Sequence, residues 1–318
     1  MNGNTPAQPF PTDTRIATPA LLESYRSALA RLKHFGLNSD KGRLREYLTE
    51  LTAQAQREAH GADVPHDNVE LANAMVEARQ LIDVASLSDE TLRARPATLA
   101  RLKEGRAVQP ADKDDPSRNF QLEYVAAAYF SSHEARVNLG DIGDAELVHG
   151  LHRWPMEVKR ARSAKSAKRL VVDARNQLQK RVSLGTEPGV ILLDATTPLT
   201  RRFRLLQAAT SAELEEKSVR QLEAFLAYRV MAPIPLEVVE RPELCGIIVR
   251  YAAVGFVHDE GGFRELTHWQ YVNVHKDEST AAKSFEKLMG VGDGRPLHLG
   301  TKERLLDAAA HLPDEEEP

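Results

Sequence analysis

The sequence has too few cysteines for a disulfide or a cysteine-rich zinc site. Its 318 residues include a single cysteine, Cys245, whereas a structural zinc site needs several Cys or His ligands at short spacing. The residues around Cys245 are apolar, which favours a buried thiol. A single cysteine is also typical of a protein in a reducing compartment. We therefore expect neither a disulfide-stabilised secreted protein nor a cysteine-based metal centre.

Long apolar segments are also missing. No stretch approaches the roughly 20 apolar residues that a membrane-spanning helix needs, and the first residues lack the apolar centre of a secretion signal. We expect a cytoplasmic protein without a membrane partner.

Several well-defined catalytic and nucleotide-binding motifs are absent. The chain has no phosphate-binding loop, nucleophile elbow, zinc-protease helix motif or Gly-rich dinucleotide motif. Any helicase or ATPase activity would then come from a separate subunit. The net charge of −4 excludes a protein that is positive over its whole surface, so contact with nucleic acid requires a local basic region.

The hydrophobic pattern divides the chain into two main parts. Residues 1–18 and the acidic tail 313–318 have the composition of disordered ends. Helical periodicity predicts a helical N-terminal domain over 19–108, where a helicase or ATPase subunit could dock. The polar segment 109–115 interrupts this pattern, and 116–312 predict an α/β domain.

Helices and strands alternate in the predicted α/β domain. The apolar run 189–193 is typical of a central strand that is covered on both faces. Residues 279–311 predict two closing helices around a Gly-rich segment. The other elements that we expect are helices at 118–131, 164–181 and 211–229, and strands at 135–139, 145–149, 156–160, 246–257 and 264–274.

One predicted strand carries charged residues on a single face. Met156 and Val158 alternate with Glu157 and Lys159, so the apolar pair faces the core and the charged pair faces the opposite side. The charged face could line a cleft. The alternative is an ion-pair ladder on an exposed hairpin face, which would contribute little to stability.

A third charged residue could join this face. Asp144 opens the strand 145–149, and a hairpin with the next strand would bring Asp144 beside Glu157. Two adjacent carboxylates repel each other, and Mg²⁺ or Mn²⁺ relieves this repulsion because such ions prefer oxygen ligands. The ion could activate a water while Lys159 offsets charge on a phosphate. This combination predicts metal-dependent hydrolysis of phosphodiester bonds.

Asp144 with the triplet Glu157-Val158-Lys159 resembles the motif of the PD-(D/E)XK, or restriction-endonuclease-like, superfamily. In that superfamily an Asp precedes a Glu-x-Lys triplet on the second strand of a hairpin. The resemblance covers about residues 117–197 and implies a mixed central sheet flanked by helices. It also implies a nuclease, either an endonuclease or an exonuclease, for which we expect DNA as the substrate with RNA as the alternative. By analogy it implies a role in bacterial antiviral defence or DNA processing.

The resemblance extends to the two neighbouring helices. Glu123, in the helix before the hairpin, matches an acidic residue that can add a metal contact, and Gln177, in the helix after it, matches a Gln beside the site. The implied catalytic residues are Asp144, Glu157, Lys159 and Gln177. The implied metal ligands are Asp144, Glu157 and Glu123.

Basic residues gather around the same hairpin. Residues 153–181 contain ten Lys or Arg and two Asp or Glu, a local excess of eight positive charges (10 − 2). A surface of this kind could follow nucleic-acid phosphates, although a solvated helix face explains part of it. The predicted nucleic-acid contacts are Arg160, Arg162, Lys165, Lys168, Arg169 and Arg175.

Two alternatives remain open. Gly143 stands where the family motif has a Pro, so Asp141 competes with Asp144 as a ligand. The chain could also be a catalytically inactive nucleic-acid-binding or scaffold module with the same fold.

Overall fold

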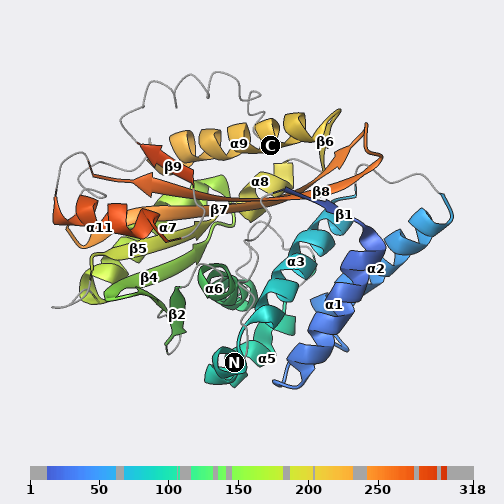
Figure 1. The fold of residues 1–318 in the computed structure, drawn as a ribbon, viewed down its shortest axis with the longest axis horizontal. Coiled ribbons are helices and arrows are strands. Elements are labelled where there is room, and N and C mark those ends of the chain that lie inside the picture. Colours follow the sequence, from blue (N-terminus) through green and yellow to red (C-terminus); the bar gives the residue numbers. More distant parts are fainter. Residues whose placement is uncertain are drawn as a thin grey trace, which may run out of the picture.

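A computed structural model provides the structure of the protein. It describes residues 13–61, 68–105, 107, 116–131, 135–140, 145–181, 187–202, 205–231, 242–275, 279–291 and 295–298. Within these residues the strands form one mixed sheet of nine, with helices on both sides (Figure 1).

Helices dominate the N-terminal part of the described chain, as predicted. Apolar side chains recur at three- and four-residue steps in the three longest of them and are buried there. The bounds are α1 (Thr18–Lys33), α2 (Arg43–Ala59), α3 (Val69–Ser86), α4 (Asp89–Ala94), α5 (Pro96–Ala100) and the 3-10 turn η1 (Arg101–Lys103).

The remaining helices and strands alternate along the chain, and among them the helix at residues 196–202 and the strand at 206–208 were not predicted from the sequence. The helices are α6 (Pro116–Ser131), α7 (Ala164–Arg181), α8 (Thr196–Arg202), α9 (Ser211–Phe225), the π-helix η2 (Leu226–Met231) and α11 (Thr280–Met289). The strands are β1 (Asp13–Ile16), β2 (Arg136–Leu139), β3 (Ala145–His149), β4 (His152–Arg160), β5 (Gly189–Asp194), β6 (Leu206–Ala208), β7 (Leu244–Val257), β8 (Gly262–Asn273) and β9 (Arg295–His298).

The sheet has the strand order β1-β8-β7-β5-β4-β3-β2, with β6 beside β7 and β9 beside β8. The pairs β4–β5 and β5–β7 are parallel, whereas β2, β3 and β4 form an antiparallel series. β5 is buried along its whole length and has a neighbour on each side. The prediction of a central strand is therefore confirmed.

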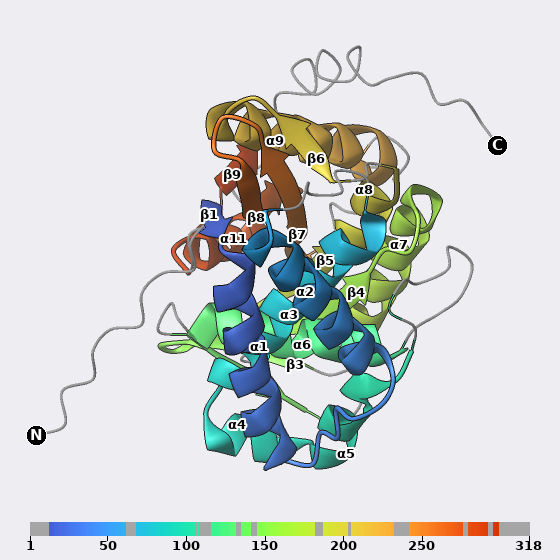
Figure 2. The same ribbon diagram turned by 90° about the vertical axis from the view of Figure 1, so that its right-hand side faces the viewer.

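Two hydrophobic layers cover the sheet. In β5, Val190 and Leu192 belong to the hydrophobic cluster that includes residues of α3, α6 and α11, whereas Ile191 and Leu193 belong to the cluster that includes residues of α7 and α9. In Figure 2, α7 lies to the right of α1, α2 and α6. The strand β4 lies between α6 and α7 in the same way. Alternate side chains of β4 therefore point toward α6 and toward α7.

Both ends of the described chain join the sheet. Asp13–Ile16 pairs with β8, so the expected disorder over residues 1–18 is wrong for this segment, because an open strand edge supplies hydrogen-bond partners. Arg295–His298 also pairs with β8, inside the region where we expected two helices around a Gly-rich segment and no strand. The first closing helix is confirmed as α11, and the second falls outside the described residues.

The two predicted domains share one core in the described residues. A single hydrophobic cluster includes Leu22 of α1, Leu81 of α3, Tyr124 of α6 and Trp269 of β8. The predicted boundary, 109–115, lies outside the described residues. The N-terminal helices thus contribute to the core that supports the sheet.

Gly246 of β7 allows a close contact between the sheet and α11. A Cβ added there would lie 2.2 Å from Phe285 Cδ2 and 3.0 Å from the Val272 carbonyl oxygen. Phe285 is buried, so moving its ring would disturb the surrounding packing. Gly246→Ala is therefore expected to lower the free energy of unfolding by about 1–3 kcal/mol. Urea unfolding measures this, with Gly262→Ala as control because its Cβ would meet nothing closer than 3.7 Å. Equal losses in both variants would contradict the prediction.

Candidate functional site

The hairpin of β3 and β4 forms as predicted. The strands pair antiparallel from Ala145 opposite Met156 to His149 opposite His152, and the turn uses Gly150 at a φ of +58°. Asp144 and its alternative, Asp141, lie outside the described residues. The structure therefore does not test the predicted contact between Asp144 and Glu157.

The alternation of side chains along β4 is confirmed. Met156 is buried in the core and Val158 packs against the same core, while Glu157 and Lys159 lie on the face that α7 covers. Glu157 is only 3% exposed, so the interpretation of an exposed hairpin face does not hold for it. This burial makes its ion pairs stronger than those on a surface.

Three of the predicted site residues meet in this position. Lys159 Nζ donates to Glu157 Oε2 at 2.8 Å and to Gln177 Oε1 at 2.6 Å. Gln177 comes from α7, whose buried apolar side chains hold the helix against β4 and β5. The tertiary structure thus orients the ammonium group of Lys159 between a carboxylate and an amide.

Arg181, one helical turn after Gln177, was not predicted as a site residue. Its Nη1 donates to Glu157 Oε1 at 2.7 Å and to the Met156 carbonyl at 3.1 Å, and its Nη2 donates to the Ala145 carbonyl at 2.8 Å. The four-residue spacing from Gln177 was a signal that could have identified it.

Glu123 approaches the site from α6. Burial raises the pKa of Glu123, although its ion pair with Arg95 opposes the shift. The charge of Lys159 also lowers this pKa and that of Glu157 raises it. Arg95, which precedes α5, is a second residue that the sequence analysis did not identify.

The donor chemistry of these residues suits a hard cation. Glu123 and Glu157 offer carboxylate oxygens, which Mg²⁺ and Mn²⁺ prefer. Yet Arg95, Lys159 and Arg181 already pair with them, which leaves one positive charge in excess at full ionisation (3 − 2). In the part of the chain that the structure describes, no group of three or more His, Cys, Asp or Glu could hold a metal ion.

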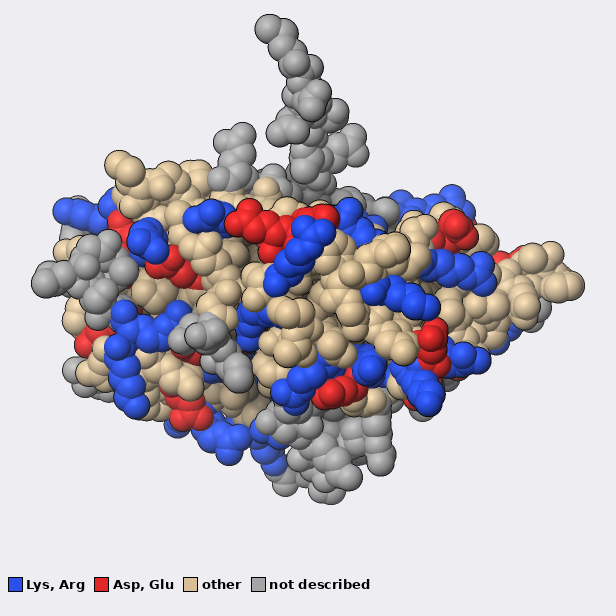
Figure 3. Space-filling view, turned by 90° about the horizontal axis from the view of Figure 1, so that it is seen from below, with Lys and Arg blue, Asp and Glu red and all other residues tan. Residues whose placement is uncertain are grey.

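Several predicted nucleic-acid contacts lie at the surface of α7. Lys165, Lys168 and Arg169 are exposed, and Arg175 is partly buried. Arg162, which precedes α7, is also partly buried. Figure 3 shows the face seen from below Figure 1, where Lys and Arg lie among acidic and uncharged side chains rather than in one continuous patch. A basic surface that binds nucleic acid therefore stays a prediction, and it is limited to α7 and the residues next to it.

Arg160 requires a correction. It is 6% exposed and pairs with Glu77 of α3 and Asp194 of β5, so it cannot contact nucleic acid at the surface. The alternation of β4 explains this, because Arg160 follows Met156 and Val158 on the core face.

Arg160 belongs to a buried charged network that the sequence analysis did not predict. Glu77 lies within ion-pair distance of Arg43, Arg118 and Arg160, at 2.9, 3.3 and 3.1 Å. Burial by itself would raise the pKa of Glu77, but the three arginines hold it well below its usual range. The network ties α2, α3 and α6 to the strand that carries Lys159.

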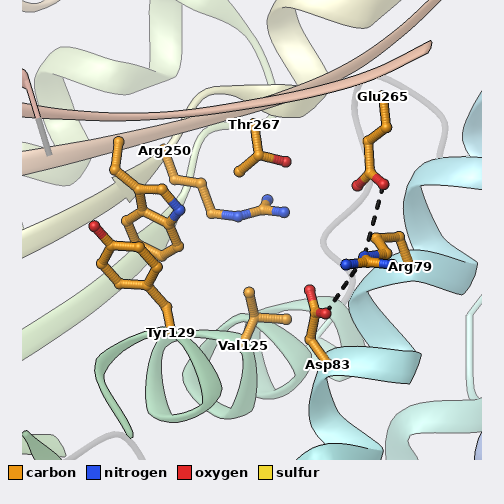
Figure 4. A pocket seen from close by; sticks show the side chains of 8 residues that line it. Arg79, Asp83, Val125, Tyr129, Arg250, Glu265 and Thr267 are labelled. Carbon is orange, nitrogen blue, oxygen red and sulfur yellow. Dashed lines mark ion pairs between the residues drawn. The ribbon is translucent and has the colours of Figure 1, made fainter. Parts of the chain in front are cut away.

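A small cavity lies apart from this site, between α3, α6, β7 and β8 (Figure 4). Arg79 lies between two carboxylates, with Nε 3.5 Å from Asp83 Oδ1 and 3.7 Å from Glu265 Oε2. Burial raises the pKa of Asp83 to about 7 and that of Glu265 to about 8, although Arg79 opposes both shifts. Arg250 also lowers both pKa values from the wall of the cavity.

These raised pKa values predict a pH-dependent stability. The folded protein binds the two protons more tightly than the unfolded chain, so this stabilisation is complete below the ordinary values of 3.8 and 4.5 and is lost as pH rises through about 7 and about 8. Glu265→Gln removes the ionising group. Since its side chain keeps 12% exposure, the expected gain over wild type near pH 9 is on the order of 1–2 kcal/mol, with little gain near pH 5.

Urea unfolding at both pH values measures this gain. Glu286→Gln, which removes an exposed carboxylate from α11, is the matched control. A difference between wild type and Glu265→Gln that does not change with pH would contradict the raised pKa.

Comparison with protein-family models, with curated proteins and with solved structures gives no match. Among the described residues, no helix has the length and apolar character needed to cross a membrane. The functional argument therefore depends on the geometry of the site.

Proposed function

We propose that this protein is a metal-dependent nuclease with a restriction-endonuclease-like fold that hydrolyses phosphodiester bonds of DNA. The observation that carries the proposal is the contact of Lys159 with both Glu157 and Gln177 between β4 and α7. The order α6, β2, β3, β4, α7 and β5, with β5 parallel to β4, supports the fold that the resemblance implies. DNA is the proposed substrate, and RNA is the alternative that the cleavage assay below includes.

Each residue of the proposed site would have its own role in hydrolysis. Glu157, with Asp144 and Glu123, would hold Mg²⁺ or Mn²⁺, which supplies Lewis-acid activation of water when bound. Lys159 would donate to a phosphate oxygen as negative charge grows there, and Gln177 would orient its ammonium group. Water oxygen bonds to phosphorus as the bond to the leaving oxygen breaks, and a proton passes to that oxygen.

A second candidate is a catalytically inactive nucleic-acid-binding module. The pairing of Glu157 with Arg181, and of Glu123 with Arg95, favours it because both carboxylates are already neutralised. A site with one excess positive charge attracts a phosphate more readily than a divalent cation.

A cleavage assay separates the two candidates. Purified protein is incubated with single- and double-stranded DNA and with RNA, with Mg²⁺ or with a chelator, and Glu157→Gln purified in the same way controls for contaminating nucleases. We expect Mg²⁺-dependent DNA cleavage that Glu157→Gln lacks. Salt-sensitive binding without cleavage would support the second candidate, and cleavage that survives Glu157→Gln would exclude the proposed site.

A separate helicase or ATPase subunit remains a proposed partner. The apolar faces of α1 and α2 are buried, so such a subunit would have to use their exposed polar faces. A pull-down experiment with the full chain would test this docking. Capture of the subunit should be lost when charges on these exposed faces are reversed.

A further inference from the structure

The cavity of Figure 4 is built by the alternation of side chains on β8. Glu265, Thr267 and Trp269 are two residues apart, so they share one face of the strand, and all three line the cavity. Arg250 of β7 pairs opposite Trp269 and lines the same cavity. The two helices that close it contribute Arg79 and Asp83 from α3 and Val125 and Tyr129 from α6.

Arg250 is a buried cation with few partners. It is 2% exposed, and its side chain extends into the cavity (Figure 4). The hydrogen bonds that it makes within the described residues run from Nη1 to Asp194 Oδ1 at 3.5 Å and to Thr196 Oγ1 at 3.4 Å, and its Nε makes none. Because a guanidinium has five N–H donors, most of the hydrogen-bonding capacity of Arg250 is left for a ligand.

Buried arginines outnumber buried carboxylates behind the cavity. Asp194, the counter-ion of Arg250, also pairs with Arg160 at 3.3 Å. Arg160 in turn shares Glu77 with two further buried arginines. Four arginines thus share two carboxylates, which leaves two positive charges in excess (4 − 2). An anion in the cavity would offset this excess, and the interior screens the attraction only weakly.

The opposite wall carries two carboxyl groups, Asp83 and Glu265. Both pair with Arg79, and burial raises their pKa values to about 7 and about 8. Below these values the protonated groups donate hydrogen bonds to an anion instead of repelling it. The charged or titratable side chains that surround Arg250 are Arg79 and Asp83 on α3, Tyr129 on α6, Asp194 on β5 and Glu265 on β8.

The size of the cavity limits the ligand to a compact group. It offers about 20 Å³ for the centre of a water-sized group, whereas a single water needs roughly 10–15 Å³. Two oxygens of a planar carboxylate match the fork of a guanidinium. We propose that this cavity binds a small carboxylate whose oxygens accept hydrogen bonds from Arg250 and Thr267. The inference does not depend on the proposed nuclease activity, because the cavity lies apart from the site between β4 and α7.

Isothermal titration calorimetry with sodium formate tests the binding, and sodium chloride at the same ionic strength is the matched anion of equal charge. At pH 6 formate is expected to bind about tenfold more tightly than chloride, which cannot form two parallel hydrogen bonds. Its affinity should fall about tenfold or more at pH 9, because Asp83 and Glu265 then ionise and repel it. Equal affinities for the two anions, or a formate affinity that is the same at both pH values, would overturn the proposal.

Variants of the two proposed donors locate the bound formate. Thr267→Val keeps the shape of the side chain but removes the hydroxyl, so it should weaken formate binding about three- to tenfold. Arg250→Met should abolish the binding. Lys180→Gln is the control, because it removes an exposed cation from α7 on the other face of the sheet and should leave the affinity within about twofold of wild type.

The test does not depend on the folding of Arg250→Met. If that variant fails to fold, Thr267→Val and the comparison of wild type at the two pH values still decide the outcome. Formate affinity that is unchanged in Thr267→Val would overturn the proposed site.

Discussion

Replacing Glu77 with glutamine is expected to lower the free energy of unfolding by about 3–5 kcal/mol. Glu77 is 2% exposed on α3, and Arg43, Arg118 and Arg160 surround it at ion-pair distance. Glutamine keeps the shape but removes the charge, so three buried guanidinium groups would lose their shared counter-ion. The cost is large because the dry interior screens their mutual repulsion poorly.

Chemical unfolding of Glu77→Gln against wild type measures this loss. Glu70→Gln is the matched control, because Glu70 lies on the exposed side of the same helix and its replacement should change stability by less than about 0.5 kcal/mol. A loss below about 1 kcal/mol for Glu77→Gln would mean that the arginines do not depend on its charge.

Replacing Lys159 with alanine is expected to slow Mg²⁺-dependent DNA cleavage by about 10²–10³-fold. Lys159 is held by Glu157 and Gln177, so its ammonium group is oriented before substrate arrives. An oriented cation stabilises charge that develops on the phosphate, and this effect appears mainly in the transition state. DNA affinity should therefore change far less than the cleavage rate.

Single-turnover cleavage and equilibrium binding separate these two effects. Lys283→Ala, which removes an exposed charge from α11 on the opposite face of the sheet, should leave both unchanged. A Lys159→Ala protein that loses binding and cleavage in equal proportion would show that Lys159 only attracts DNA.

Most helices and strands of the described chain could be predicted because their signals are local. Alternation along 156–160 separated Glu157 and Lys159 from the apolar residues, and helical spacing predicted the helix that carries Gln177. Pairing between distant segments has no such local signal. The strand at Asp13–Ile16 forms only because β8, far along the chain, offers an edge.

The candidate site was predictable only in part for the same reason. The motif and the resemblance implied that Glu157, Lys159 and Gln177 would lie together, and the described structure brings these three into contact. The pairing of Glu157 with Arg181 had not been predicted, because Arg181 had been counted only as one of the ten basic residues over 153–181. Asp144 lies outside the described residues, so its place in the site is still a prediction.

The sequence by itself determined the face of β4 to which each side chain points, since a strand alternates with a period of two. Only the tertiary structure decided which charges meet: Arg160 lies 83 positions after Glu77 in the chain and yet bonds to it in the core. The physical reason is that a buried charge is stable only beside an opposite charge or a hydrogen-bond partner. Packing determines which residues become its neighbours, and these can be far apart in sequence.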